Sequence, residues 1–383
     1  MLLTNIRRCT AILFLLAAPV ASALDIVKPV PAPPQLAAKA YVLMEYSSGR
    51  VLVEHNADQA FEPASLTKIM TDYIVSDELA KGSLDPDEEV TISEKAWKMG
   101  GSKMFIEVGK KVKVMDLIKG MVIQSGNDAS VQLAETVAGS EETFVELMNQ
   151  YAQHLGMNTT SFRNATGMPD EGHLSSAQDM AVLARSFIRD FPEDYKIYSI
   201  KTFEHNGIKQ KNRNGLLWSD DTVDGMKTGH TESAGYGLVA SAVREDMRLI
   251  AVVMGTNSAN ARLSATAKLL SYGFRFFGSR ELYAAGTAID NLRVWSGAEK
   301  TVPVGLMEPL SVAYPRGQED KLTTRIELHR GVKAPLKEGA EVGRLRVVAG
   351  EDIVADEALV ALREVPTGGI VPTVRDAVLQ YFE

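Results

Sequence analysis

The sequence predicts an α+β protein: a mixed sheet flanked by helices, then a small all-β sandwich domain, then a short C-terminal amphipathic helix. Three observations carry this prediction. Strand-like runs at 40–55 and 235–254 enclose a middle segment whose apolar residues recur at helical spacing. From about Arg280 to Val365, short runs rich in Val, Leu and Ile alternate with Gly and Pro turns, without a helical stripe. The last segment, 370–383, returns to helical spacing.

Length and composition limit the classes of protein to consider. The chain has 383 residues, 45% of them hydrophobic and 23% charged, so it can form two or three domains with buried cores. A net charge of −8 excludes broad nucleic-acid binding, which needs a basic face. One cysteine excludes an intramolecular disulfide and a cysteine-based zinc site, and the six histidines show no paired metal spacing. We therefore expect no nucleic-acid partner, no metal and no cofactor.

The N-terminus is typical of a secretory signal peptide. Two arginines precede an apolar segment, 11–20, that is too short to span a membrane, and an Ala-Ser-Ala sequence ends at residue 23. We expect residues 1–23 to be removed on export; the alternative is a buried N-terminal helix. Residues 24–35 contain too much proline for a helix or a central strand, which predicts an extended linker.

Residues 36–278 are expected to form the first domain. Two strands, Ala40–Glu45 and Val51–His55, flank a Ser-Ser-Gly turn that predicts a hairpin. Two more strands are expected at 235–243 and 248–254. Helices are expected where apolar residues recur every three or four positions. These segments are 65–79, 114–124, 128–138, 141–155, 176–187 and 260–277. The all-β domain is expected over 279–366 and the amphipathic helix over 370–383.

Ser65 and Lys68 are the first candidate for chemistry. A serine hydroxyl is a poor nucleophile until a base takes its proton. Three residues is about one helical turn, so the two side chains share one face of the predicted helix. Burial and the positive end of a helix both lower the pKa of a lysine, so a neutral Lys68 amine can be that base. Taken alone, the pair is more simply a helix N-cap at Ser65 with Lys68 in solvent.

Ser125-Gly126-Asn127 is the second candidate. It falls between two predicted helices, where a loop can present side chains into a cleft. Ser125 could relay a proton to a leaving group, and Asn127 could bind a substrate carbonyl and hold Lys68. The alternative is an ordinary helix-breaking turn, for which these residues are common.

Lys227-Thr228-Gly229-His230 is the third candidate, just before the strand at 235–243. A strand edge beside a nucleophile can pair with a bound peptide, and Gly229 lets a substrate backbone approach closely. Lys227 and Thr228 could grip a carboxylate, and the charge of Lys227 would lower the pKa of Lys68 further. The alternative is a glycine turn with a surface lysine and threonine.

Together the three motifs match a known set. Ser-x-x-Lys, Ser-x-Asn and Lys-Thr-Gly are shared by β-lactamases and penicillin-binding proteins. The surrounding segments resemble the low-molecular-mass penicillin-binding proteins, the serine D-alanyl-D-alanine carboxypeptidases of the peptidase S11 family. These segments are Ala64–Lys68, Ser125–Ala129, Arg213–Trp218 and Asp224–Thr231. The resemblance runs from about Leu36 to the C-terminus and implies a β-lactamase/transpeptidase-like fold for the first domain.

The resemblance also implies catalytic roles. Ser65 would be the acyl-ester nucleophile and Lys68 its proton acceptor. Ser125 would pass the proton to the departing D-alanine. The backbone N–H groups of Ser65 and His230 would form an oxyanion hole.

Substrate-binding roles follow in the same way. Lys227 and Thr228 would hold the terminal carboxylate, and Asn127 the penultimate amide. Arg213 and Arg262 are further candidates for the carboxylate pocket, with a structural ion pair as the alternative for each.

The resemblance implies partners and a location as well. The substrate would be the D-Ala-D-Ala end of a peptidoglycan pentapeptide, and β-lactam antibiotics would be covalent inhibitors. The protein would be periplasmic and attached peripherally to the inner membrane by its C-terminal helix. That helix pairs an apolar face with a net charge of only −1, from Arg375, Asp376 and Glu383. Interfacial helices usually carry cations, so we expect weak attachment through apolar burial; the alternative is a helix packed on the protein itself.

Two other functions compete with this one. A class A-like β-lactamase shares the three motifs, but it needs a Glu-x-x-Leu-Asn loop for deacylation, and the nearest match, Glu171–Ser175, lacks the Asn. The middle residue Gly126 also departs from the Asp usual in that class. Without that glutamate, an acyl group from penicillin should persist on Ser65. A catalytically silent penicillin-binding sensor is the second alternative, against which the complete motifs argue.

Overall fold

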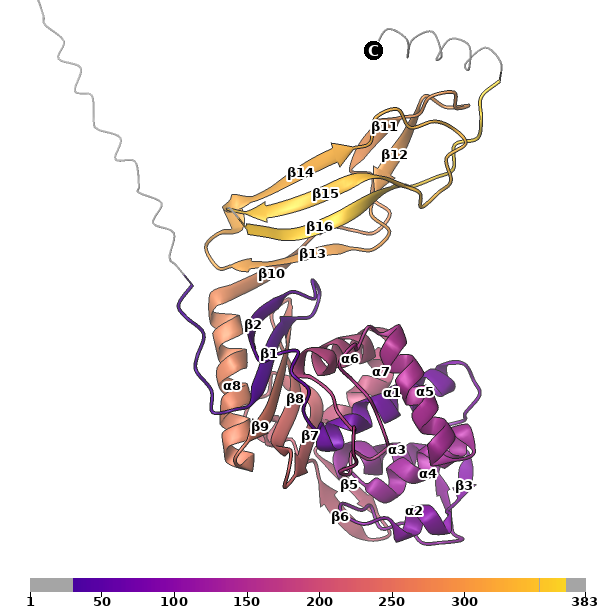
Figure 1. The fold of residues 1–383 in the computed structure, drawn as a ribbon, viewed down its shortest axis with the longest axis vertical. Coiled ribbons are helices and arrows are strands. Elements are labelled where there is room, and N and C mark those ends of the chain that lie inside the picture. The colour runs from indigo at the N-terminus through magenta and orange to yellow at the C-terminus, as the bar shows by residue number, and fades with distance from the viewer. Residues whose placement is uncertain (1–29, 351, 370–383) are drawn as a thin grey trace, which may run out of the picture.

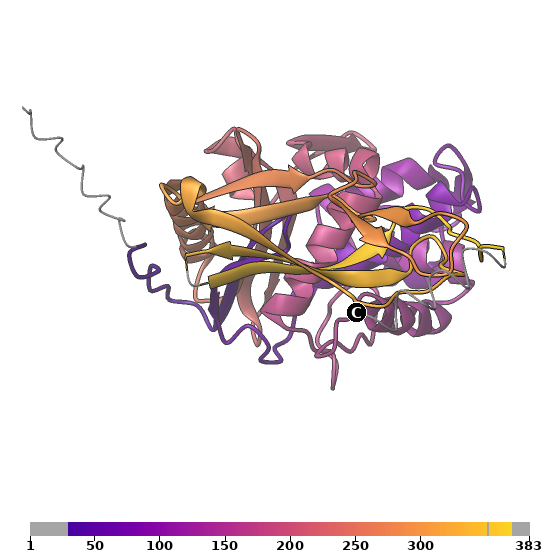
Figure 2. The same ribbon diagram turned by 90° about the horizontal axis from the view of Figure 1, so that it is seen from above.

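The computed structural model describes residues 30–350 and 352–369. The predicted signal peptide, the first residues of the predicted linker and the predicted C-terminal helix lie outside the described residues. A helix-rich domain built on one sheet is joined to a β-domain at the end of helix α8 (Ala259–Phe276) (Figure 1). Seen from above, the β-domain lies across the first domain (Figure 2). No helix in the described part of the chain is long and apolar enough to cross a membrane.

Five strands form the central sheet in the order β2-β1-β9-β8-β7. They are β1 (Ala40–Glu45), β2 (Val51–His55), β7 (Val223–Thr231), β8 (Gly235–Arg244) and β9 (Met247–Thr256). Every pairing is antiparallel, so the expectation of a mixed sheet is wrong. The reason is connectivity, because short turns join β1 to β2 and β7 to β8 to β9, and hairpins make antiparallel neighbours.

Helices cover both faces of this sheet. On one face, α8 packs against alternate residues such as Leu43 and Leu238. On the other face, α6 (Ala177–Asp190) packs against their neighbours, such as Val42 and Val239. Successive side chains of a strand point to opposite faces, so both faces of the sheet are apolar and buried.

The helix expected at 65–79 has two parts. A short 3₁₀ helix, η1 (Ala64–Thr67), leads into α1 (Lys68–Ala80). Every residue from Lys68 to Ser76 is buried, so α1 is a central helix rather than the one-sided amphipathic helix that the apolar stripe predicted. It lies among the helices that follow it in the chain, as Figure 1 shows. Lys68 therefore has no route to solvent along the helix surface.

The remaining helices confirm most of the predicted segments to within a few residues. They are α3 (Val114–Ile123), α4 (Asn127–Ala138) and α5 (Glu141–His154). Four short helices in this domain were not predicted: α2 (Glu94–Lys98), α7 (Pro192–Tyr195), η2 (Lys196–Ser199) and η3 (Gly215–Trp218). Two small hairpins were not predicted. Their strands are β3 (Glu89–Thr91) with β4 (Lys111–Lys113), and β5 (Thr202–His205) with β6 (Ile208–Lys211).

The β-domain confirms the expected sandwich. A two-stranded sheet of β10 (Phe277–Tyr283) and β13 (Leu310–Pro315) packs on a five-stranded sheet through a core that includes Tyr314 and Leu345. The larger sheet has the order β11 (Asp290–Arg293), β12 (Thr301–Gly305), β16 (Asp352–Ala361), β15 (Glu341–Ala349), β14 (Leu322–Leu328). At the junction, Arg316 donates its backbone N–H to the carbonyl of Phe276 and its Nε–H to that of Phe274.

Candidate active site

The three motifs meet at one cavity of about 390 Å³. It opens between η1, the α3–α4 connection, the edge strand β7 and the N-terminal end of α8. Its lining residues are Ser65, Ser102, Ser125, Arg213, Thr228, Gly229, His230, Tyr236, Ala259 and Arg262. Segments more than 150 residues apart in the sequence thus contribute to one site.

Ser65 and Lys68 lie on the same side of η1 and the start of α1. The Lys68 Nζ is 3.0 Å from the Ser65 Oγ, and the ammonium side chain is fully buried. No side chain caps η1, so Ser65 is not the simple N-cap that was the alternative. The predicted pairing of a hydroxyl with a lysine is therefore present.

Two further acceptors orient the Lys68 amine. Its Nζ donates to Asn127 Oδ1 at 2.7 Å and to the Thr166 carbonyl oxygen at 2.5 Å. A neutral amine has two N–H bonds and one lone pair. When Asn127 and Thr166 accept both N–H bonds, the lone pair is left to face the Ser65 hydroxyl. The prediction that Asn127 holds Lys68 agrees with this geometry, whereas the carbonyl of Thr166 was not foreseen.

Burial lowers the pKa of Lys68 from 10.5 to about 7. The positive charge of Arg213 contributes to this lowering, while the carboxylate of Asp128 opposes it. The second cause thus differs from the prediction, which assigned it to Lys227. A substantial fraction of Lys68 is then a neutral base near neutral pH.

Ser125 and Asn127 lie where α3 passes into α4. Ser125 adopts a left-handed backbone (φ +65°), and its buried Oγ lines the cavity without a hydrogen-bond partner among the described residues. Asn127 is the first residue of α4, and its Nδ2 donates to the Gly100 carbonyl at 2.8 Å. A left-handed non-glycine residue is strained and is common at functional sites. A free hydroxyl here can take part in proton transfer.

Asp128 supports this connection and was missed from the sequence. Its carboxylate accepts from the backbone N–H groups of Met104, Phe105 and Ile106 at 2.9–3.3 Å. It thereby holds the loop that carries Ser102 beside the cavity. An acid directly after a Ser-x-Asn triplet, in the first turn of a helix, was the signal available in the sequence.

Lys227, Thr228 and Gly229 belong to the edge strand β7, not to a surface turn. Lys227 is 2% exposed and its Nζ donates to the Thr228 carbonyl at 3.2 Å. Gly229 packs against the nucleophile segment: an added Cβ would lie 2.9 Å from the Pro63 carbonyl oxygen. Close packing within the protein thus favours glycine at this position. We had predicted a different reason, the close approach of a substrate backbone.

The cavity concentrates positive charge. Arg213 and Arg262 line it, and Lys68 and Lys227 are buried behind the lining. Arg262 donates to the carbonyls of Gly229 and Gly237, and neither arginine forms an ion pair with a carboxylate among the described residues. This contradicts the alternative of structural ion pairs for Arg213 and Arg262.

The basic groups also disfavour one another's charge. Burial, and then the charges of Lys68, Arg213 and Arg262, hold the pKa of Lys227 well below its usual value. Burial lowers the pKa of Arg262 to about 10. An anion bound in the cavity would relieve this repulsion, so the site favours a ligand with a carboxylate.

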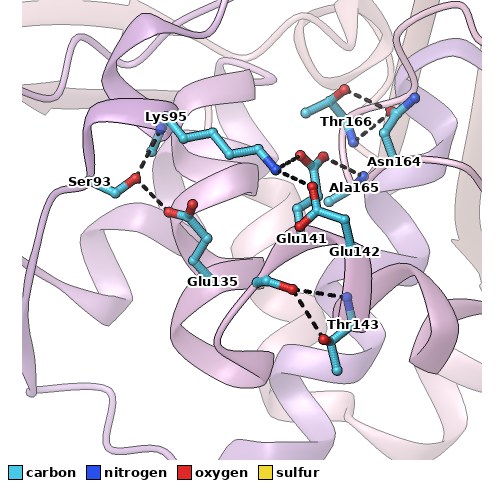
Figure 3. Close-up of polar contacts among 11 residues, drawn as sticks. Ser93, Lys95, Glu135, Glu141, Glu142, Thr143, Asn164, Ala165 and Thr166 are labelled. Atoms are coloured by element: carbon cyan, nitrogen blue, oxygen red, sulfur yellow. Dashed lines mark hydrogen bonds and ion pairs between the residues drawn. The ribbon is translucent and has the colours of Figure 1, made fainter.

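A loop behind Lys68 supplies the Thr166 carbonyl. Asn164 Oδ1 accepts from the backbone N–H groups of Thr166 and Gly167, which curls the loop. Glu141 at the start of α5 accepts the Ala165 N–H at 3.1 Å and pairs with the Lys95 ammonium at 3.0 Å (Figure 3). No group of three His, Cys, Asp or Glu side chains that could hold a metal occurs in the described part of the chain.

Two family models match the chain. The model described as D-alanyl-D-alanine carboxypeptidase, peptidase S11, matches residues 27–258. The model described as the C-terminal domain of penicillin-binding protein 5 matches residues 277–367. Helix α8 lies between the two matches, and the second begins with β10.

Individual proteins are similar over most of the chain. D-alanyl-D-alanine carboxypeptidase DacC of Escherichia coli strain K12 is 43% identical over 357 residues, covering 91% of this chain and 89% of DacC. DacA of Haemophilus influenzae is 44% identical and covers 88% of each chain.

Solved structures superpose on the model. Penicillin-binding protein 5 from Haemophilus influenzae does so with a TM-score of 0.85 at 43% identity, over 88% of this chain and 99% of that one. The ampicillin-bound form of penicillin-binding protein D2 from Listeria monocytogenes gives a TM-score of 0.59 at 31% identity, over 64% of this chain and all of that one.

Proposed function

The chain belongs to the peptidase S11 family of D-alanyl-D-alanine carboxypeptidases, and from this premise we propose that Ser65 is its nucleophile and Lys68 its general base. The neutral Lys68 amine takes the proton of the Ser65 hydroxyl as Oγ attacks the carbonyl carbon of the penultimate D-alanine. The backbone N–H groups of Ser65 and His230 stabilise the developing oxyanion. The observation that carries this assignment is the Lys68 amine, 3.0 Å from Ser65 Oγ and held by two other acceptors.

Collapse of the tetrahedral intermediate breaks the bond between the carbonyl carbon and the nitrogen of the terminal D-alanine. Ser125 passes the proton from Lys68 to that nitrogen, so the D-alanine leaves as a neutral amine. Its free hydroxyl at the cavity supports this role. Water then attacks the ester on Ser65, which releases the shortened peptide and restores the serine hydroxyl.

The substrate's terminal carboxylate binds among the cations of the cavity. Lys227 and Thr228 hold it, and Arg213 and Arg262, which line the cavity, add positive charge. Asn127 binds the penultimate amide. A pentapeptide stem ending in D-Ala-D-Ala has the free carboxylate that this set of residues requires.

β-Lactam antibiotics are proposed to acylate the same serine. A relative is known in an ampicillin-bound form, and the chain covers that relative's whole length. Glu171 is exposed, and its segment lacks the Asn that a class A β-lactamase uses, so a penicilloyl ester on Ser65 should be long-lived.

We base a proposal for the setting on the sequence patterns at 1–23 and 370–383. We propose export through the signal peptide at 1–23 to the periplasm. We also propose that the amphipathic segment 370–383 attaches the protein peripherally to the inner membrane. Apolar burial, rather than the charge of cationic side chains, would drive this attachment.

Release of D-alanine from a pentapeptide ending in D-Ala-D-Ala tests the function. We expect repeated turnover by the wild-type chain and none by Ser65→Ala, whose circular dichroism should be unchanged. A fluorescent penicillin should label the wild type covalently and not the variant. Labelling that persists in Ser65→Ala would place the nucleophile elsewhere, and acylation without turnover would indicate a sensor instead of an enzyme.

A further inference from the structure

His173 is a buried side chain that the proposed mechanism does not use. It is 2% exposed and lies at the end of the loop that supplies the Thr166 carbonyl. The edge of Phe162 packs against its ring, with the ring centres 5.8 Å apart. Burial lowers the pKa of His173 to about 4, so the imidazole is uncharged near neutral pH.

Both ring nitrogens of His173 are used. Nδ1 accepts the backbone N–H of Arg163 at 3.0 Å. A neutral imidazole that accepts at Nδ1 carries its proton on Nε2. Nε2 lies 2.8 Å from Thr67 Oγ1 and therefore donates to it. Thr67 stands between Ser65 and Lys68 in the sequence, so the hydrogen bond joins the loop to the nucleophile segment itself.

The loop touches that segment at other points as well. The Ala165 carbonyl accepts from Thr71 Oγ1 at 2.8 Å. Gly167 has a φ of +82° and packs so closely that an added Cβ would lie 1.8 Å from the Ala64 carbonyl oxygen. The carbonyl between these two residues, that of Thr166, accepts from Lys68. A small displacement of the loop would therefore move an acceptor of the general base.

We propose that His173 is a positioning residue that fastens the Thr166 loop to Thr67 and so sets the orientation and the burial of the Lys68 amine. This inference rests on the proposed role of Lys68. The side chain at position 173 must carry an acceptor and a donor on opposite sides of one rigid group, because the acceptor binds the Arg163 N–H and the donor binds Thr67. Glutamine offers the same pair, with Oε1 as the acceptor and Nε2 as the donor, whereas alanine offers neither.

The test compares acylation by a fluorescent penicillin in four variants: His173→Ala, His173→Gln, Thr67→Val and the double variant His173→Ala/Thr67→Val. We expect His173→Ala to slow the acylation step by about 10²-fold, the loss that follows a misplacement of about 1 Å at a reacting centre. The dissociation constant of the initial complex should change little. His173→Gln should restore most of the rate. Glu171→Gln, an exposed change on the same loop, is the matched control and should acylate normally.

Two readouts separate positioning from a purely structural role. If His173 acts through Thr67, the double variant should be no slower than either single variant, because both remove the same link. The acid limb of the acylation rate should also move in His173→Ala, since the loop controls the burial of Lys68. A purely structural defect would lower the active fraction equally at every pH and leave that limb in place.

Several outcomes would overturn the proposal. They are a normal rate in His173→Ala, a His173→Gln variant as slow as the alanine variant, multiplicative losses in the double variant, or an unmoved acid limb. If His173→Ala does not fold, Thr67→Val and His173→Gln keep the side-chain volume and decide the question: the first must be slow and the second must not. Labelling of Ser65→Ala tests the underlying mechanism separately.

Discussion

The protonation of Lys68 should set the pH dependence of acylation. Its pKa is about 7 because the amine is buried, and only the neutral amine can take the Ser65 proton. Below this pH we expect the acylation rate to fall about tenfold per pH unit, as the neutral fraction does. Lys68→Ala should lose about 10²–10⁴-fold, the usual effect of general-base catalysis. Stopped-flow labelling with a fluorescent penicillin measures both, and a flat profile would remove Lys68 from the mechanism.

Arg213 should tune that profile. Its positive charge lowers the pKa of Lys68, so Arg213→Gln should raise this pKa and move the acid limb to higher pH. Lys268→Gln removes an equal charge from an exposed position on α8 that does not line the site, and it should leave the limb in place. Equal shifts in both variants would mean that overall charge, and not the local field of Arg213, controls Lys68.

Lys227 should affect substrates selectively. If its ammonium binds the terminal carboxylate, Lys227→Ala should lose most with peptides that have a free C-terminus. An amidated analogue is already a poor ligand and should lose little. Steady-state kcat/KM with the two peptides measures the difference, and an equal loss would mean that Lys227 acts mainly on the pKa of Lys68.

At the scale of single residues, the sequence identified the side chains of the three motifs, some of which line the cavity and some of which are buried behind it. Ser65, Lys68, Ser125 and Asn127 were found because a nucleophile and its base need particular residue types at particular spacings. The Thr166 carbonyl was missed because any residue has a carbonyl, and its position depends on a loop curled around Asn164. A backbone atom leaves no signal in residue identity.

Helix α1 carries a second buried ionisable group whose effect is on stability. The pKa of Asp72 is raised to about 7, mainly by burial, with a contribution from the nearby charge of Asp194. A carboxyl whose pKa rises from 3.8 to about 7 on folding costs nothing at low pH and destabilises the fold progressively as pH rises to 7, by about 4 kcal/mol at most. Asp72→Asn cannot ionise, so we expect it to be more stable than the wild type at pH 8, with a gap that closes toward pH 4.

Urea unfolding at several pH values measures this difference. Asp246→Asn, in the exposed turn between β8 and β9, should show no such pH-dependent gain. A wild type as stable as Asp72→Asn at pH 8 would contradict the assignment of a destabilising charge to Asp72.

Long elements were predictable and short ones were not. Helices such as α5 and α8 show many turns of apolar spacing, and β8 and β9 are long apolar runs. The β3–β4 and β5–β6 hairpins have strands of three or four residues with mostly exposed or partly buried side chains, and these strands are too short for a period to emerge. The helix α1 was predicted, but the burial of its polar face from Lys68 to Ser76 was not, because periodicity reveals a helix's apolar face and not what covers its polar one.

Over the whole molecule, attachment to a membrane should depend on the C-terminal segment. Flotation of the mature chain with liposomes should be lost when residues 370–383 are deleted. It should persist in neutral lipid and in salt, because the segment carries a net charge of −1 and the proposed attachment is through apolar burial. Flotation that survives the deletion would refute the anchor. Flotation that needs anionic lipid and vanishes in salt would refute the apolar account of its strength.

The order of the domains was predictable from the pattern of apolar residues. Their helical spacing stops near residue 280, where short apolar runs separated by Gly and Pro begin. The boundary lies at Phe276–Phe277, where α8 ends and β10 begins. This pattern does not show how the two domains contact each other. That depends on single contacts such as Arg50 with the carbonyl of Ala313, 263 residues away in the sequence.

Helix α8 acts as a spacer between the site and the β-domain. Ala259 and Arg262 at its first turn line the cavity, whereas Phe276 at its other end meets the β-domain. Its 18 residues span about 27 Å, and the β-domain, which holds the last described residues, lies beyond the C-terminal end of α8 in Figure 1. Surface potentials in physiological salt decay over about 8 Å. A bilayer bound at the C-terminal end would leave the protonation of Lys68 independent of the charge of its lipids.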